Sequence, residues 1–142
     1  WLLMVAMLAG GVAVAVQPSI NARLAEKIGY LQAATISFAV GTLILLFLSL
    51  SAGQGGFRRI VDAPWWQLTG GLFGAFFVTM TIVAVPRIGV SAVLALTIAS
   101  QLVAGLVMDH YGLFGMRDIP FDFKRLLGII LLLVGVALIC RR

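Results

Sequence analysis

The chain has 142 residues and a mean hydropathy of +1.14, with 62% hydrophobic and only 11% charged residues. Soluble domains have about 45–50% apolar and about 25% charged residues, so this composition excludes a soluble globular fold and predicts an integral membrane protein. The ten Lys and Arg residues outnumber the five Asp and Glu residues, but because each lies at or near the end of an apolar segment, we assign them to lipid headgroups and expect no nucleic-acid partner.

Five apolar segments approach the length of about 20 residues that a helix needs to cross a bilayer core. We predict helices at residues 1–27, 30–50, 64–85, 90–109 and 125–140. The first segment has no basic region before it and no small-residue cleavage site after it, so we interpret it as a span and not as a signal peptide. The predicted fold is all-α, with a single five-helix transmembrane domain over residues 1–142.

The connections between these helices differ in length. Residues 51–63 are polar and rich in glycine, and residues 109–124 form the longest predicted loop. Pro64 is expected to begin the third helix, with Trp65 and Trp66 as interfacial anchors. Residues 86–89 are so few that the third and fourth helices must form a hairpin. Because small residues let helices approach closely in lipid, we expect packing roles for Gly41, Gly70, Gly74, Gly128 and Gly135.

Polar side chains inside a span are costly and are therefore candidates for function. Gln17 and Asn21 are four residues apart, so they share one face of the first helix. Pro18 lies between them and is expected to kink the helix and to free the carbonyl of Val14. The structural alternative is an interfacial kink at which both amides hydrogen-bond to neighbouring helices.

The fourth helix holds a second polar pair, Thr97 and Gln101, at the same spacing of four. A threonine can satisfy its own helix carbonyl, whereas a glutamine near mid-helix needs another partner. Asp109 and His110 end this helix. They are consistent with a proton relay or, as we favour from their position, with a structural cap that anchors the following loop.

The distribution of reactive residues excludes several functions. Glu26 is the only glutamate and lies at a helix end, so no carboxylate is expected at mid-membrane for proton-coupled export of cations. We therefore expect a neutral, anionic or amphipathic cargo. Cys140 is the only cysteine, which excludes an intrachain disulfide. Neither a catalytic triad, a metal-ligand cluster nor a phosphate-binding loop is recognisable, so we expect no enzyme, no metal and no cofactor.

The basic residues are divided evenly between the two sides of the predicted membrane. Orientation follows an excess of Lys and Arg on the cytoplasmic side, so an even division gives no preferred orientation. An odd number of spans without this bias predicts a dual-topology protein that pairs with an inverted copy of itself. One face holds Arg58, Arg59, Arg117, Lys124 and Arg125, and the other holds Arg23, Lys27, Arg87, Arg141 and Arg142.

Several sequence elements also occur together in a known family. They are Gln17-Pro18-x-x-Asn21, Ser37-Phe38-x-x-Gly41-Thr42, Gly70-Gly71-x-x-Gly74-Ala75, Val85-Pro86-Arg87-Ile88-Gly89 and Asp109-His110-x-Gly112-Leu113-Phe114-Gly115. In these elements the chain resembles the YdcZ-like branch of the drug/metabolite transporter superfamily, which consists of small five-helix proteins of the bacterial inner membrane. The resemblance implies half of a ten-helix transporter whose two five-helix repeats are inverted relative to each other.

The sequence thus favours a small-molecule transporter, exporter-like, that works by alternating access as an antiparallel homodimer around a central cavity. Its expected partners are the inverted second copy, membrane lipids and the substrate. The alternatives are an accessory subunit of a heterodimer and a passive dual-topology channel. The candidate substrate-binding residues are Gln17, Asn21, Ser37, Thr97 and Gln101.

Overall fold

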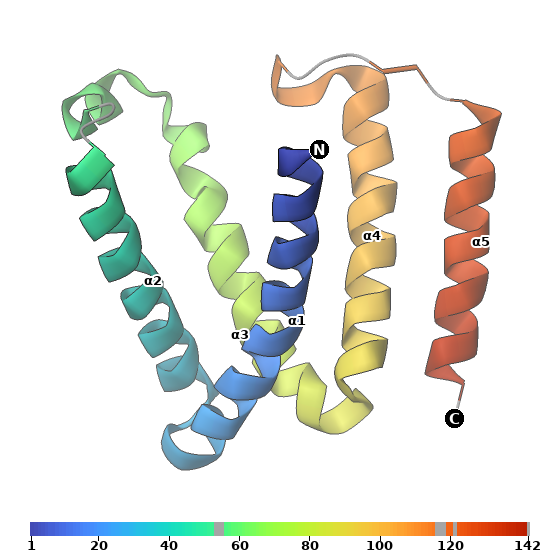
Figure 1. Ribbon diagram of the computed structural model, residues 1–142, viewed down its shortest axis with the longest axis horizontal. Helices are drawn as coiled ribbons and strands as arrows, with labels where there is room; N and C mark the ends of the chain where they lie inside the picture. The colour runs from blue at the N-terminus through green and yellow to red at the C-terminus, as the bar shows by residue number, and fades with distance from the viewer. Residues whose placement is uncertain (53–55, 116–118, 121, 142) are drawn as a thin grey trace. The chain divides into compact units, whose positions relative to one another are not determined.

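The computed structural model describes residues 1–52, 56–115, 119–120 and 122–141 (Figure 1). Within these residues the fold is all-helical, and five helices are long and apolar enough to cross a membrane. The predicted fold class is therefore confirmed. The helices are α1 Leu2–Ile28, α2 Tyr30–Ala52, α3 Gly70–Ile88, α4 Val90–Tyr111 and α5 Phe123–Cys140.

Two of the helix connections consist of one glycine each. Gly29 joins α1 to α2 with φ 93° and ψ 155°, and Gly89 joins α3 to α4 with φ 85° and ψ 155°. Residues with a side chain rarely adopt these positive φ values, whereas glycine adopts them at little cost. The connection between the third and fourth helices is thus even shorter than the sequence indicated, and their packing as a hairpin stays a prediction.

The segment before α3 is more helical than expected. Phe57–Asp62 forms a 3₁₀ helix (η1) inside the predicted loop, and Trp65–Thr69 forms a second one (η2) where an α-helix was predicted. Pro64 is the residue just before η2, and α-helical geometry begins only at Gly70. A short 3₁₀ turn at a helix N-terminus is common. The Thr69 hydroxyl also donates to the Trp66 carbonyl, three residues earlier in the chain, at 2.7 Å.

The far ends of α3 and α4 also extend past their predicted limits. α3 continues through Pro86 to Ile88. A proline lacks an N–H donor and its ring crowds the carbonyl four residues earlier, but the two residues after it keep their own N–H donors. α4 continues to Tyr111 and ends at Gly112, which is left-handed (φ 55°, ψ 35°) and donates its N–H to the Met108 carbonyl. This is the usual glycine termination of a helix.

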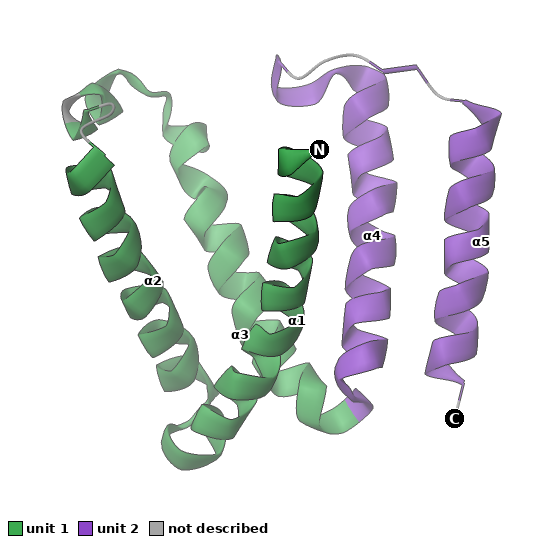
Figure 2. Cartoon of the chain, viewed as in Figure 1, with its two compact units in different colours: residues 1–87 green, residues 88–142 purple. Residues whose placement is uncertain are grey.

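The chain forms two compact units, residues 1–87 and 88–142 (Figure 2). In the first unit a small buried core joins α1, α2 and α3; the fully buried residues are Ala33, Ala34, Val78 and Ile82, with Leu24, Ala25 and Phe77 packed against them. Alanines in this core let the helices approach closely. In the second unit α4 contacts α5. That residues 1–142 act as a single domain stays a prediction.

Most of the remaining surface is apolar and exposed. Figure 1 shows α1 and α2 meeting at the turn between them and separating toward their other ends. Consistent with this separation, residues 1–14 are all exposed. In a membrane, such apolar surface is covered by lipid or by another helix.

Only one of the five glycines expected to pack helices has a close neighbour among the described residues. A Cβ atom added at Gly74 of α3 would lie 3.3 Å from the Phe38 ring of α2. A Cβ atom added at the other four, Gly41, Gly70, Gly128 and Gly135, would have no atom within 4 Å. The packing role of these four residues stays a prediction.

Candidate functional site

A polar cluster joins α1 to α2 inside the first unit. The Asn21 Nδ2 donates to Ser37 Oγ at 3.1 Å, and the Gln17 Nε2 donates to the same oxygen at 3.4 Å. Asn21 is buried, with 6% of its surface exposed, while Gln17 and Ser37 are half-buried. Three of the five predicted binding residues therefore lie together, and the two amides converge on one hydroxyl.

The local sequence explains this convergence. A spacing of four places Gln17 and Asn21 on the same side of α1, one turn apart. α1 remains a single helix through Pro18, which is itself buried, so the helix face on either side of the proline is preserved. That Pro18 kinks α1 stays a prediction. Hydrogen bonds between helices give polar groups at membrane depth the partners that lipid cannot supply.

A pocket of about 200 Å³ lies beside this cluster. Gln17 contributes from α1, and the remaining wall comes from one side of α2: Ser37, Phe38, Gly41, Thr42 and Leu45. The lining thus combines an amide, two hydroxyls, an aromatic ring and aliphatic surface, and it contains no ionisable side chain. Pockets of this kind, mostly apolar with a few convergent polar groups, are typical of small-molecule sites.

Four residues of this wall were not proposed from the sequence as binding residues: Phe38, Thr42, Leu45 and Gly41, of which Gly41 was expected to pack helices. Phe38 and Thr42 appear in the family-like element of α2, but apolar and hydroxyl residues are common in every membrane helix. The signal that could have found them is their spacing. Residues 38, 42 and 45 follow each other at four and three positions, so they share the helix face that begins at Ser37.

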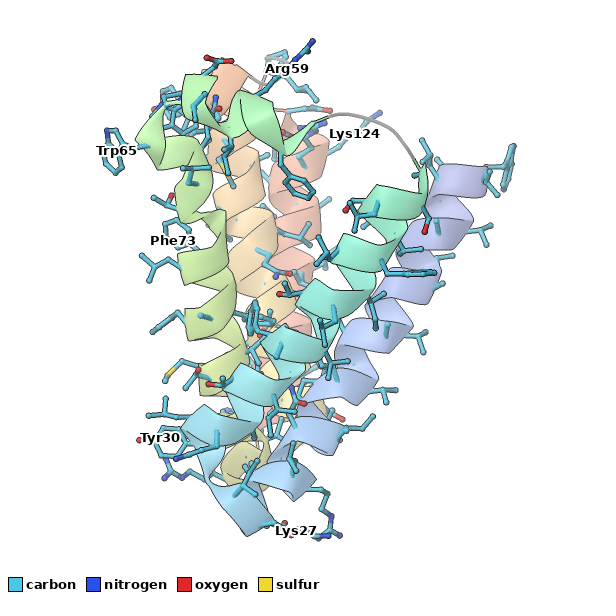
Figure 3. All side chains as sticks on the ribbon, turned by 90° about the vertical axis from the view of Figure 1, so that its left-hand side faces the viewer. Lys27, Tyr30, Arg59, Trp65, Phe73 and Lys124 are labelled. Atoms are coloured by element: carbon cyan, nitrogen blue, oxygen red, sulfur yellow. The ribbon has the colours of Figure 1, made fainter. Side chains whose placement is uncertain are left out.

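The charged side chains of the first unit are at the ends of its helices (Figure 3). Lys27 and Tyr30 lie at one end, and Arg59 and Trp65 lie at the other. The basic residue of α1 next along the chain from Asn21 is Arg23. Its side chain is 83% exposed, and its Nη1 lies 3.2 Å from Glu26 Oε2. The charges are therefore placed as expected for headgroup contact, away from the polar cluster.

The other two predicted binding residues belong to the second compact unit. Thr97 is half-buried and Gln101 is exposed, both on α4. Ser100, beside them, donates its hydroxyl to the Thr97 carbonyl at 2.9 Å, so it satisfies a group of its own helix. Binding roles for Thr97 and Gln101 stay predictions.

Asp109 connects α4 to the beginning of α5. Its Oδ2 lies 3.2 Å from Arg125 Nη1, and its backbone carbonyl accepts a hydrogen bond from the Ile119 N–H at 2.8 Å. His110 stacks edge-on against Tyr111, with ring centroids 4.9 Å apart. Asp109 thus has the anchoring contacts that the sequence favoured. Its Arg125 partner was missed, although both residues were placed on the same face of the membrane at the ends of adjacent helices.

Next to this ion pair a second, larger pocket of about 450 Å³ lies between α4 and α5. Apart from Asp109 and Arg125 at one end, its lining is apolar: Leu102, Gly105, Leu106, Gly128, Ile129 and Leu132. The pocket is therefore a groove between two lipid-embedded helices. It lacks the convergent polar groups of the pocket beside Ser37.

Five spans with a neutral polar cluster between two of them define a multi-pass α-helical membrane protein. The chain belongs to the family described as "Putative inner membrane exporter, YdcZ", whose sequence model matches residues 2–138. It is also 34% identical over 143 residues to the inner membrane protein YdcZ of Escherichia coli (strain K12), an alignment covering 96% of this chain and 93% of that protein. No solved structure matches the chain at a significant level.

These comparisons confirm the family resemblance and place the chain in the inner membrane, as a multi-pass protein. The family is one of membrane exporters and not a family of enzymes. The chain is thus a transporter-type membrane protein.

Proposed function

We propose that the chain is one half of a small-molecule exporter, which it completes by pairing with an inverted copy of itself. The observation that carries this proposal is the neutral polar cluster of Gln17, Asn21 and Ser37 beside a pocket within an otherwise apolar bundle. Transporter sites are typically built near the bilayer midplane, where repeats of opposite orientation meet. A single copy supplies one such repeat.

The even division of basic residues supports the inverted pairing. Arg23 is the residue whose depth decides this balance, because it lies five residues before the end of α1, or about 7.5 Å along the helix axis. The side chain of Arg23 is 83% exposed and can reach the membrane interface from that depth. Arg23 is therefore counted with the basic residues on the side of the membrane where α1 ends. Arg117 and Arg142 lie outside the described residues, and their places in the count come from the sequence.

Alternating access follows from this assembly. In an inverted pair the two copies are related by a two-fold axis in the membrane plane, so a rocking motion that closes one face opens the other. The pocket beside Ser37 would open to each side of the membrane in turn. The absence of ionisable side chains from its lining favours an uncharged or weakly polar cargo.

Efflux from proteoliposomes tests the transport function. Vesicles containing the purified protein are loaded with a mixture of neutral, anionic and cationic metabolites, and the loss of each compound is followed by mass spectrometry against protein-free vesicles. We expect at least one neutral compound to leave at a rate that saturates with its concentration, as a transporter requires and a passive channel does not.

Two variants accompany this measurement. Ser37→Ala is expected to lower the saturable rate by about tenfold, because the shared hydrogen-bond acceptor of Gln17 and Asn21 is lost. Gln101→Ala tests the remaining prediction on α4, and an unchanged rate would remove Gln101 from the site. Efflux that never saturates for any compound would contradict the proposed transporter.

A further inference from the structure

We infer that the pocket beside Ser37 binds an uncharged single-ring molecule, with its polar group on Gln17 and Ser37 and its flat apolar face on Phe38, and that Gly74 sets the position of this aromatic wall. The inference rests on the proposed transport function only in taking the pocket as the cargo site.

The volume limits the size of the ligand. Pockets for drug-sized molecules are roughly 300–1,000 Å³, whereas an apolar cavity of roughly 150 Å³ is enough for benzene. The pocket beside Ser37 has about 200 Å³. It therefore has room for one aromatic ring with a small substituent.

The lining determines the charge of the ligand. No ionisable side chain lines the pocket, so a charged ligand would lose its hydration without gaining a counter-ion. Gln17, which lines the pocket, keeps a second N–H and a carbonyl oxygen besides the N–H that binds Ser37 Oγ, and the Ser37 hydroxyl can itself donate. These groups can pair with the amide or hydroxyl of a neutral ligand at one end of the pocket.

The aromatic wall depends on a residue outside the pocket. The Phe38 ring packs on the backbone of α3 at Gly74, where an added Cβ atom would lie 3.3 Å from the ring Cζ and 3.5 Å from its Cε1. The shorter of these distances is tighter than an ordinary van der Waals contact, so a Cβ atom at position 74 requires the ring to shift by a few tenths of an ångström. Because the ring is a wall of the pocket, the pocket changes shape with it.

Gly74 is therefore a specificity-determining residue that acts through Phe38. Gly71 provides the comparison, since it lies on the same helix and an added Cβ atom there has no neighbour within 4 Å. Replacing either glycine with alanine raises the helix propensity of α3 by the same amount. Only the substitution at Gly74 also changes a contact with the pocket wall.

Three isosteric probes test the charge and size of the ligand: 4-fluorobenzamide, 4-fluorobenzoate and 4-fluorobenzamidinium, which are neutral, anionic and cationic. Binding to the full chain in lipid nanodiscs is measured by fluorine NMR, with empty nanodiscs subtracted for partition into lipid. We expect saturable binding of the benzamide and at least about tenfold weaker binding of both charged probes. A charged probe that binds as tightly, or no saturable binding of the benzamide, would overturn the inference.

Paired variants locate the binding. Ser37→Ala should weaken benzamide binding by about tenfold, the equivalent of one hydrogen bond. Ser49→Ala on the same helix should leave it unchanged, because the Ser49 hydroxyl donates to the Leu46 carbonyl of its own helix at 2.9 Å. Equal effects of the two variants would place the probe elsewhere.

The role of Gly74 has its own cycle of variants. Gly74→Ala should weaken benzamide binding by about fivefold or more, the scale of an overpacked site, while Gly71→Ala should not. In a Phe38→Leu background Gly74→Ala should have no further effect, because the ring through which it acts is gone. An equal loss with and without the ring would reveal a general disturbance of α3 and overturn the assignment. Circular dichroism and size-exclusion chromatography confirm that each variant is folded.

The transport and binding experiments can fail separately. Benzamide that binds at Ser37 while no compound shows saturable efflux would refute the exporter and leave the site intact. Saturable efflux that Ser37→Ala and Gly74→Ala do not change would keep the exporter and refute this site.

Discussion

Gly29 and Gly89 have nearly the same backbone conformation, and each is the single residue between two consecutive helices. At Gly29 an added Cβ atom would also lie 2.6 Å from the Gln32 Oε1. The contact itself is with the flexible end of a side chain and can be relieved. The positive φ of 93° cannot, because any other residue keeps its steric clash with its own backbone.

We therefore predict that Gly29→Ala destabilises the protein by about 1–3 kcal/mol, the usual cost of holding a residue with a side chain in this region. The free energy of unfolding can be measured by titrating the micelle-solubilised protein with sodium dodecyl sulfate. Gly11→Ala is the matched control on α1, where an added Cβ atom has no neighbour within 4 Å. Equal stabilities of the two variants would show that the turn relaxes without glycine.

At the scale of helices, the ion pair of Asp109 and Arg125 links the end of α4 to the beginning of α5. Asp122 adds a second fixed point, because its side chain accepts a hydrogen bond from the Lys124 N–H at 3.3 Å and caps α5. The Asp109 and Arg125 side chains are 42% and 38% exposed, so water and salt screen their attraction. The pair therefore contributes modestly to stability and more to the register of the two helices.

A double-mutant cycle with Asp109→Asn and Arg125→Gln measures this link. We expect a coupling free energy of about 0.2–1 kcal/mol, as for other exposed ion pairs, and we expect it to shrink as salt is added. Thermal unfolding of the four proteins in detergent at low and high ionic strength gives both values. A coupling that is zero at low salt would show that the two side chains do not interact in solution.

The elements differ in how far the sequence could predict them. Five spans follow from long apolar segments, and the short connection at Gly89 follows from the few residues between the third and fourth segments. The beginning of α3 does not follow, because a proline and two tryptophans are compatible with either an α-helix or the observed 3₁₀ turn. The end of α3 was placed too early, since the rule that proline breaks helices is weaker in the last turn, where few hydrogen bonds remain to be lost.

The candidate site also has one part that the sequence could predict and one part that it could not. The spacing of Gln17 and Asn21 predicts one shared helix face, and both bind Ser37 across the α1–α2 interface. The rotation of α2 about its axis decides which of its side chains join them, and that depends on alanine packing at residues 33 and 34. Periodicity groups Phe38 with Thr42 and Leu45 on one face of α2, but it does not tell which face of α2 turns toward Gln17 and Asn21.

For the whole molecule, the even division of basic residues predicts equal insertion in both orientations. C-terminal fusions to alkaline phosphatase and to green fluorescent protein should both be active, since the first works only outside the inner membrane and the second only inside. Introducing Lys at the exposed positions Gly56 and Asp62 should shift insertion toward one orientation and lower transport. Gln at the same positions is the control.

Co-expression separates orientation from damage to the fold. A copy with Arg58→Gln and Arg59→Gln has the opposite charge bias and should restore transport to the Lys variant by supplying the inverted partner. A single orientation of the unmodified chain would contradict the homodimer and favour a heterodimer subunit.

With five consecutive spans, the one-glycine turns at Gly29 and Gly89 fall on one side of the membrane by their order along the chain, and the longer connections before α3 and before α5 fall on the other. A protease added to one side of a membrane would therefore cleave only the copies whose long connections face it. In a population of inverted pairs, half of the chains would be cut in right-side-out vesicles and the other half in inside-out vesicles. The fragments from both preparations would have identical lengths.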